Sequence, residues 1–128
     1  MKRLNIRSNT KWEDLISYSR AVRSGNHIEV SGTTAVDGDK IIGRGDPSAQ
    51  AVFIFNKIGK ALQDAGAEMK HVVRTRIFLR NISDWEAVGK IYAEVFRDIN
   101  PAASMIEVGG FIHPDMLMEI EVTAITES

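Results

Sequence analysis

The sequence contains no cysteine, and this absence removes several classes of chemistry at once. A chain without thiols cannot form a disulfide, a thiolate zinc site or a cysteine nucleophile. Its three histidines, His27, His71 and His113, stand far apart and lack the spacing of metal ligands. We therefore expect neither a metal nor another cofactor.

The chain also lacks long apolar runs and an excess of either charge. No run approaches the roughly 20 apolar residues of a membrane span, and the N-terminal segment MKRLNIRSNT has no apolar stretch after its charges, unlike a signal peptide. Sixteen basic residues stand against seventeen acidic ones, whereas a broad nucleic-acid or anionic-membrane surface needs a basic excess. We expect a cytoplasmic protein that binds neither nucleic acid nor a membrane.

What the chain does have is enough apolar surface for a core. Its 128 residues are 44% hydrophobic and 26% charged, the balance of a soluble globular protein. The length matches one ordinary domain, so we expect a single domain over residues 1–128.

The periodicity of the apolar residues predicts an alternation of strands and helices. Asp46-Pro47 starts a helix whose apolar stripe is Val52, Phe55, Ile58, Leu62 and Ala65, and Gly66 ends it. Ser83-Asp84-Trp85-Glu86 has the spacing of a capping box and opens a second helix, which Asn100-Pro101 ends. The expected strands cover residues 2–6, 18–22, 27–31, 72–79, 103–108 and 116–125.

Two amphipathic helices can cover only one face of such a mixed sheet, which makes the fold α+β. Strand alternation puts Val73, Thr75, Ile77 and Leu79 on one face of their strand, and Ser104, Ile106 and Val108 under the helices in the next. The uncovered face then collects Arg74, Arg76, Glu107, Glu119 and Glu121 beside Phe78 and Met105. So many charges among apolar side chains indicate an interface between subunits.

The order of short motifs resembles the RidA/YjgF family, also known as the endoribonuclease L-PSP family. The matching pieces run from about Tyr18 to Ile125, nearly the whole chain. They are Tyr18-Ser19-Arg20-Ala21-Val22, Gly25-Asn26, Val30-Ser31-Gly32, Gln50, Leu62, Ala65-Gly66-Ala67, Val72-Val73-Arg74-Thr75, Phe78, Asp84-Trp85, Tyr92, Phe96, Pro101-Ala102-x-Ser104, Glu107-Val108 and Glu119-Ile120-Glu121. Each piece is weak by itself, but their order and spacing together are specific.

The resemblance implies a chorismate-mutase-like (YjgF-like) fold and a homotrimer whose sheets form a central β-barrel, with ligand clefts between neighbouring subunits. Active members of the family hydrolyse reactive enamines and imines to 2-keto acids and ammonia. That reaction needs a cation for the substrate carboxylate, a carboxylate that holds water at the imine carbon, and polar donors for the developing charge.

Carried over residue by residue, the family's site matches this chain in part. Glu119 corresponds to the water-positioning glutamate, Tyr18 to a cleft tyrosine, Ser31 with Gly32 to the family's Ser-Gly, and Glu107 to the acidic residue after the signature. The anchoring arginine of the Pro-Ala-Arg-Ser signature is Ala103. Two further family positions, an asparagine and a cysteine, are Gly89 and Met105 here.

The missing arginine leaves alternatives open. Arg20 shares a strand face with Tyr18, and Arg76 faces the same side as Glu119, so either arginine could replace the anchor. Alternatively, Arg74 and Arg76 do no more than neutralise the charges of Glu119 and Glu121. Our first hypothesis is that the chain hydrolyses an imine, enamine or related small molecule and acts poorly on 2-imino acids. The alternative is a non-catalytic trimer that binds a metabolite or a protein, and an endoribonuclease is a weaker one.

Overall fold

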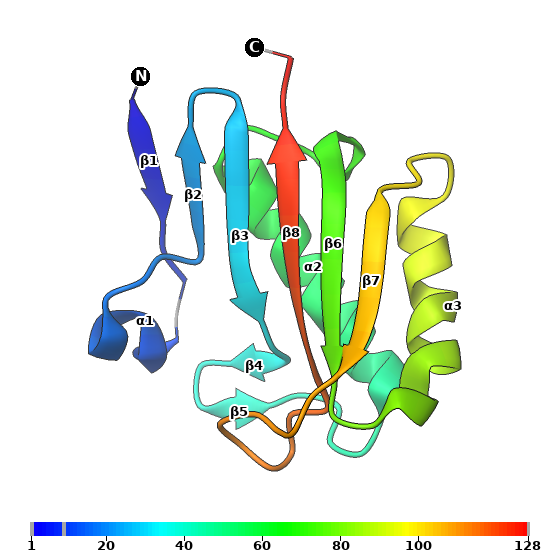
Figure 1. The fold of residues 1–128 in the computed structure, drawn as a ribbon. Helices are drawn as coiled ribbons and strands as arrows, with labels where there is room; N and C mark the ends of the chain where they lie inside the picture. The colour runs from blue at the N-terminus through cyan, green and yellow to red at the C-terminus, as the bar shows by residue number, and fades with distance from the viewer. Residues whose placement is uncertain (1, 9, 128) are drawn as a thin grey trace.

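A six-stranded sheet with two helices on one face dominates the computed structural model, which describes residues 2–8 and 10–127 (Figure 1). The strand order is β1-β2-β3-β8-β6-β7, and only β6 and β7 run parallel. A separate two-stranded hairpin, β4-β5, lies beyond the lower end of the sheet in this view. The mixed α+β architecture that the sequence predicts is therefore confirmed.

The elements largely follow the predicted order. The strands are β1 (Arg3–Ile6), β2 (Ala21–Ser24), β3 (His27–Thr33), β4 (Val36–Asp37), β5 (Lys40–Ile41), β6 (Val72–Leu79), β7 (Ala102–Glu107) and β8 (Met118–Ile125). The helices are α1 (Lys11–Ile16), α2 (Pro47–Asp64) and α3 (Trp85–Phe96), with two 3-10 turns at Met69–His71 and Ile82–Asp84.

Helix α2 begins and ends where its sequence signals stand. The Asp46 carboxylate accepts a hydrogen bond from the Ala49 amide at 3.1 Å, Pro47 is the first helical residue, and Gly66 follows the helix with a φ of +84°. The expected stripe is wrong at one position, because Val52 is 43% exposed. The neighbouring Ala51 and Ile54 complete the buried face instead.

Helix α3 forms as expected but without a capping box. Its N-cap residue is Asp84, whose side chain makes no capping hydrogen bond. The Asn81 side chain instead accepts from the Ser83 amide at 3.1 Å, which supports the 3-10 turn that leads into α3. The helix ends at Phe96, before the predicted Asn100-Pro101 stop.

The buried face of β6 shifts at a bulge near its start. Val72 is 3% exposed and Val73 is 44% exposed, whereas Thr75, Ile77 and Leu79 are fully buried. The pairing with β8 is irregular between Val72 and Arg74, so the alternation changes phase there. Val73 therefore does not share the buried face, contrary to the prediction.

The predicted orientation of β7 is wrong by one residue. Residues in register on adjacent strands point to the same face, and the parallel pairing joins Thr75 to Ala103 and Phe78 to Ile106. Since Thr75 is buried under the helices, Ala103 faces the helix layer, and so does Met105, which packs against the core. Ser104 and Ile106 lie on the open face, and Ile106 is 44% exposed.

Helix α1 is absent from the sequence-based prediction, and β2 begins at Ala21 rather than at Tyr18. Thr10 and Glu13 have the spacing that signals a helix start, and that signal could have found α1. The helix is short and ends at Ile16, and its C-cap residue Ser17 has a φ of +65°. Residues 18–20 then lead into the sheet.

Candidate active site

Glu119 and Gly32 touch at the lower end of the sheet in Figure 1, where β3 ends and β8 begins. A Cβ atom on Gly32 would lie 2.5 Å from Oε1 of Glu119, so only glycine leaves room for this carboxylate. Glu119 is paired in register with Phe78 and points to the open face of the sheet. Its side chain is half-buried against the Gly32 backbone.

Arg20 lies beneath this contact and is almost completely buried, with 4% of its surface exposed. It donates from a terminal guanidinium nitrogen to the Gly32 carbonyl at 2.7 Å and lies 5.6 Å from the centre of the Tyr18 ring. Ser31 donates to the Ser19 carbonyl at 2.6 Å. Five predicted site residues thus gather here, and we call Tyr18, Arg20, Ser31, Gly32 and Glu119 the Glu119 cluster.

The environment of Glu119 favours its protonated form more than water does. Burial and the nearby Glu121 carboxylate raise the pKa of Glu119, while the Arg20 guanidinium opposes the shift. A carboxyl group with a raised pKa can accept and return a proton closer to neutral pH. The cluster can therefore hold and polarise a water molecule beside a reacting carbon.

A second buried carboxylate, that of Glu13, was missed by the sequence analysis. Glu13 is 1% exposed and accepts hydrogen bonds from the Ser8 amide, the Ser8 hydroxyl and the Thr10 hydroxyl. Burial by itself would raise the pKa of Glu13, but these hydrogen bonds and the charge of Arg20 outweigh it and the pKa is lowered. Glu13 is thus a fixed anion that balances the buried guanidinium of Arg20.

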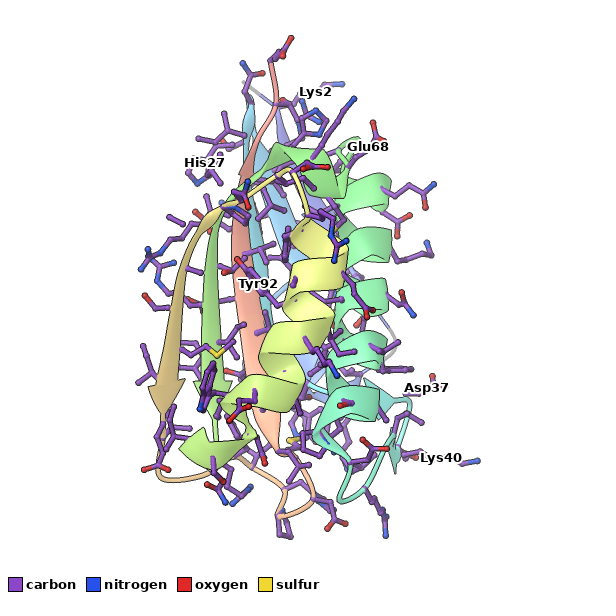
Figure 2. The ribbon with its side chains drawn as sticks, turned by 90° about the vertical axis from the view of Figure 1, so that its right-hand side faces the viewer. Lys2, His27, Asp37, Lys40, Glu68 and Tyr92 are labelled. Carbon is purple, nitrogen blue, oxygen red and sulfur yellow. The ribbon has the colours of Figure 1, made fainter. Side chains whose placement is uncertain are left out.

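Ala103 lies in a different place, in a pocket of about 170 Å³ between β7 and α3. The pocket is lined by Ile77, Tyr92, Ala103, Ser104 and Met105. Tyr92 points from α3 toward the sheet (Figure 2), and its hydroxyl lies 2.9 Å from that of Thr75. We call these five residues the Ala103 pocket.

The Ala103 pocket and the Glu119 cluster do not meet within one chain. Ala103 faces the helix layer, whereas Glu119 faces the open side of the sheet, two strands away. Glu107 is also separate, because it is in register with the buried Leu79 and its carboxylate accepts from the Ile82 amide at 2.9 Å. The prediction that Glu107 shares the open face is therefore wrong.

Arg76 and Arg74 both have partners on the open face. Arg76 pairs with Glu121, with 3.6 Å between a guanidinium nitrogen and Oε1. Arg74 donates to the Ser104 hydroxyl at 3.0 Å. Arg20 and Arg76 are the two arginines that could replace the missing anchor. Arg20 lies beside Glu119, whereas Arg76 is paired with Glu121.

Comparison with known proteins agrees with this fold. The family model described as endoribonuclease L-PSP matches residues 10–126. The chain belongs to this family, which is also called RidA/YjgF. The 3-aminoacrylate deaminase RutC of Acinetobacter baylyi is 34% identical over 86% of this chain and 87% of its own. An uncharacterized protein of Streptomyces coelicolor is 35% identical, over 93% and 89%.

A solved structure confirms the family fold at higher identity. Rv2704 of Mycobacterium tuberculosis, described as a member of the YjgF/YER057c/UK114 family, is 39% identical and superposes with a TM-score of 0.89. The match covers 98% of this chain and all of that one.

The three positions at which the resemblance implies a different residue, Gly89, Ala103 and Met105, lie close together in the structure. Ala103 and Met105 line the Ala103 pocket, and a Cβ atom on Gly89 would lie 4.0 Å from Cε of Met105. Tyr92 and Ser104 bring hydroxyl groups to the pocket, whereas Gly89, Ala103 and Met105 have no strong hydrogen-bond donor in their side chains.

Across residues 2–8 and 10–127, no three histidine, aspartate or glutamate side chains gather as metal ligands. In the same ranges, no helix has the length and apolar character needed to cross a bilayer.

Proposed function

We propose that this protein is a homotrimeric, cytoplasmic hydrolase of the RidA/YjgF family, built from one domain, that acts on a small imine, enamine or related C=N compound. The observation that carries this proposal is the half-buried Glu119, which lies against Gly32 with Arg20 beneath it and has a raised pKa. Such a carboxyl group suits the task of holding water and moving its proton. The relative RutC is named as a 3-aminoacrylate deaminase, which supports a substrate of this class.

The separation of the two parts within one chain supports a site that is shared between two copies. The Glu119 cluster opens on the uncovered face, and the Ala103 pocket lies on the helix side of the edge strand β7. One chain cannot bring them to one ligand, but the edge strand of a second copy can approach the first chain's open face. The paired charges and the exposed Ile106 on that face support such packing.

The substrate we propose lacks a carboxylate beside its C=N bond, or carries it where Arg20 can reach. The Ala103 pocket offers no cation, and a charge-assisted hydrogen bond of this kind contributes about 1.5–3 kcal/mol. Its wall of Ile77, Ala103 and Met105 suits an uncharged, apolar group instead. We therefore expect weak activity on 2-imino acids.

The test compares the natural chain with Ala103→Arg in an assay that generates 2-aminoacrylate in place. We expect the natural chain to be slow and Ala103→Arg to gain about ten-fold or more in kcat/KM, because the arginine restores a partner for the carboxylate. Glu119→Gln in the Ala103→Arg background should remove the gain. If the natural chain already matches relatives that carry the arginine, the proposed role of Ala103 is wrong.

A second candidate is a trimer that binds a metabolite without turning it over. The Ala103 pocket favours it, because none of the residues that line the pocket is charged. A panel of neutral imines separates the two candidates: turnover that disappears in Glu119→Gln supports the hydrolase, and binding without turnover supports the binding protein.

A further inference from the structure

A second, larger pocket of about 450 Å³ lies on the helix side of the molecule, away from the Ala103 pocket. It is enclosed by α2, by the end of β1 with the residues after it, and by β4. Figure 2 shows Asp37, one of its lining residues, on the β4-β5 hairpin beside α2. Its apolar wall consists of Ile6, Val36, Phe53 and Ala61. We call it the Lys57 pocket.

Basic side chains outnumber acidic ones in its lining. Arg7, Arg20, Lys57 and Lys60 stand against Asp37 and Asp64. The outer pair is satisfied, because Lys60 donates to both carboxylate oxygens of Asp64 at 2.8 Å. Arg7 is held by Asp14 and Glu13. Arg20 and Lys57 are left as the inner cations of the pocket.

Neither inner cation is fully paired with an anion. Lys57 donates to the neutral Val36 carbonyl at 2.9 Å, and its ammonium group has two further protons to donate. Burial lowers the pKa of Lys57 and the charge of Arg20 adds to this, whereas Glu13 and Asp37 oppose the shift. Arg20 is 4% exposed, and its Nε atom has no hydrogen-bond partner among the described residues.

Glu13 and Asp37 offset part of the charge of these two cations. A ligand carboxylate would give the remaining protons of Lys57 a charged acceptor beside Arg20, in place of the hydration lost on burial. The wall formed by Ile6 and Phe53 adds a surface that a purely inorganic anion would leave uncovered. Charge and wall together select a ligand with one anionic end and one apolar end.

We propose that the Lys57 pocket binds a small organic anion whose carboxylate contacts Lys57 and Arg20 and whose apolar body packs on Ile6 and Phe53. This site is separate from the proposed hydrolytic site, since it shares only Arg20 with the Glu119 cluster and no residue with the Ala103 pocket. Its ligand is therefore a second small molecule rather than the compound that is hydrolysed.

The experiment titrates the full-length protein with hexanoate and with its neutral analogue hexanamide while backbone amide shifts are followed by NMR. We expect hexanoate to bind about ten-fold more tightly, with the largest shifts at the Lys57 pocket. Lys57→Met should reduce hexanoate binding to the level of hexanamide, and Lys57→Arg should retain it. The matched control is Lys90→Met, the same change on the exposed side of α3, which should bind hexanoate normally.

Each contrary result overturns the proposal. These are equal affinity for the two compounds, shifts centred on Ala103 and Tyr92, or unchanged hexanoate binding in Lys57→Met. If Lys57→Met does not fold, Lys57→Gln, which keeps a donor for the Val36 carbonyl, takes its place in the same comparison.

Discussion

Gly32 has no side chain at the point where a methyl group would meet the carboxylate of Glu119. The backbone at Gly32 is not in the left-handed region, so a glycine is needed here for the space it leaves and not for its backbone conformation. Glu119 reaches its half-buried position because β3 leaves this gap. The position of the carboxylate, and hence its acidity, depends on the neighbouring strand as much as on its own.

Gly32→Ala should move this carboxylate outward without unfolding the sheet. The new methyl group would lie 2.5 Å from Oε1, so the flexible end of Glu119 must rotate toward solvent. We expect the pKa of Glu119 to fall toward its ordinary value, as measured by NMR titration of labelled glutamate side chains. Gly109→Ala is the control, because a Cβ there meets nothing within 4 Å. An unchanged pKa in Gly32→Ala would show that Gly32 does not position Glu119.

Glu119→Gln should change stability in a pH-dependent way. Burial raises the pKa of Glu119, so the unfolded chain loses this proton first as pH rises and the ionised carboxylate destabilises the folded state. Replacement by the uncharged amide should therefore raise the free energy of unfolding near pH 8. The gain should vanish below the pKa of the unfolded carboxyl, near pH 4. Urea unfolding at several pH values measures this difference, and a gain that grows toward low pH would contradict it.

At the scale of elements, the two long helices begin in physically different ways. α2 starts at an aspartate whose side chain caps the helix, whereas α3 starts at an aspartate whose side chain makes no capping bond.

Asp46→Ala should cost about 1 kcal/mol in the free energy of unfolding, since the Ala49 amide loses its acceptor. Asp84→Ala should cost much less. Denaturant unfolding of both variants checks this, and equal losses would contradict it.

The sequence predicts the elements better than their contacts. Apolar periodicity locates both long helices and the strands of the sheet, because the signal lies within each segment. It predicts the wrong face of the sheet for the side chains of β7 and for Val73, because register and bulges depend on the partner strands. The six residues of α1 are too few for a clear apolar period, so the Thr10–Glu13 spacing was the one local signal for this helix.

In the candidate site too, the sequence predicts some features and misses those that depend on how the strands pair. Tyr18, Ser31, Gly32 and Glu119 lie together in the structure, and their roles in a site stay predictions. Nothing local in the sequence places Ala103 on the opposite face from Glu119, because that separation arises from the parallel pairing of β6 and β7. The buried charge of Glu13 was also invisible, since its partners Ser8 and Thr10 are ordinary polar residues in a loop.

For the whole molecule, the open face of the sheet is the surface through which the proposed trimer would form. It carries the Arg76–Glu121 ion pair, the carboxylate of Glu119 and the exposed Ile106 on the edge strand β7. An edge strand offers unpaired backbone groups as well, which favour association with another copy. A trimer would cover this face and bring one chain's Ala103 pocket toward another chain's Glu119 cluster.

Ile106→Lys should therefore break the assembly. The natural chain is expected at three times its 14.2 kDa mass, about 43 kDa, in light scattering after size-exclusion chromatography. A lysine at position 106 would place a charge in the apolar part of the interface and shift the protein toward monomer. Val52→Lys is the control, because Val52 has a similar exposure, 43% against 44%, on the outer side of α2. A natural chain that stays monomeric, or equal behaviour of the two variants, would rule out the open face as the interface.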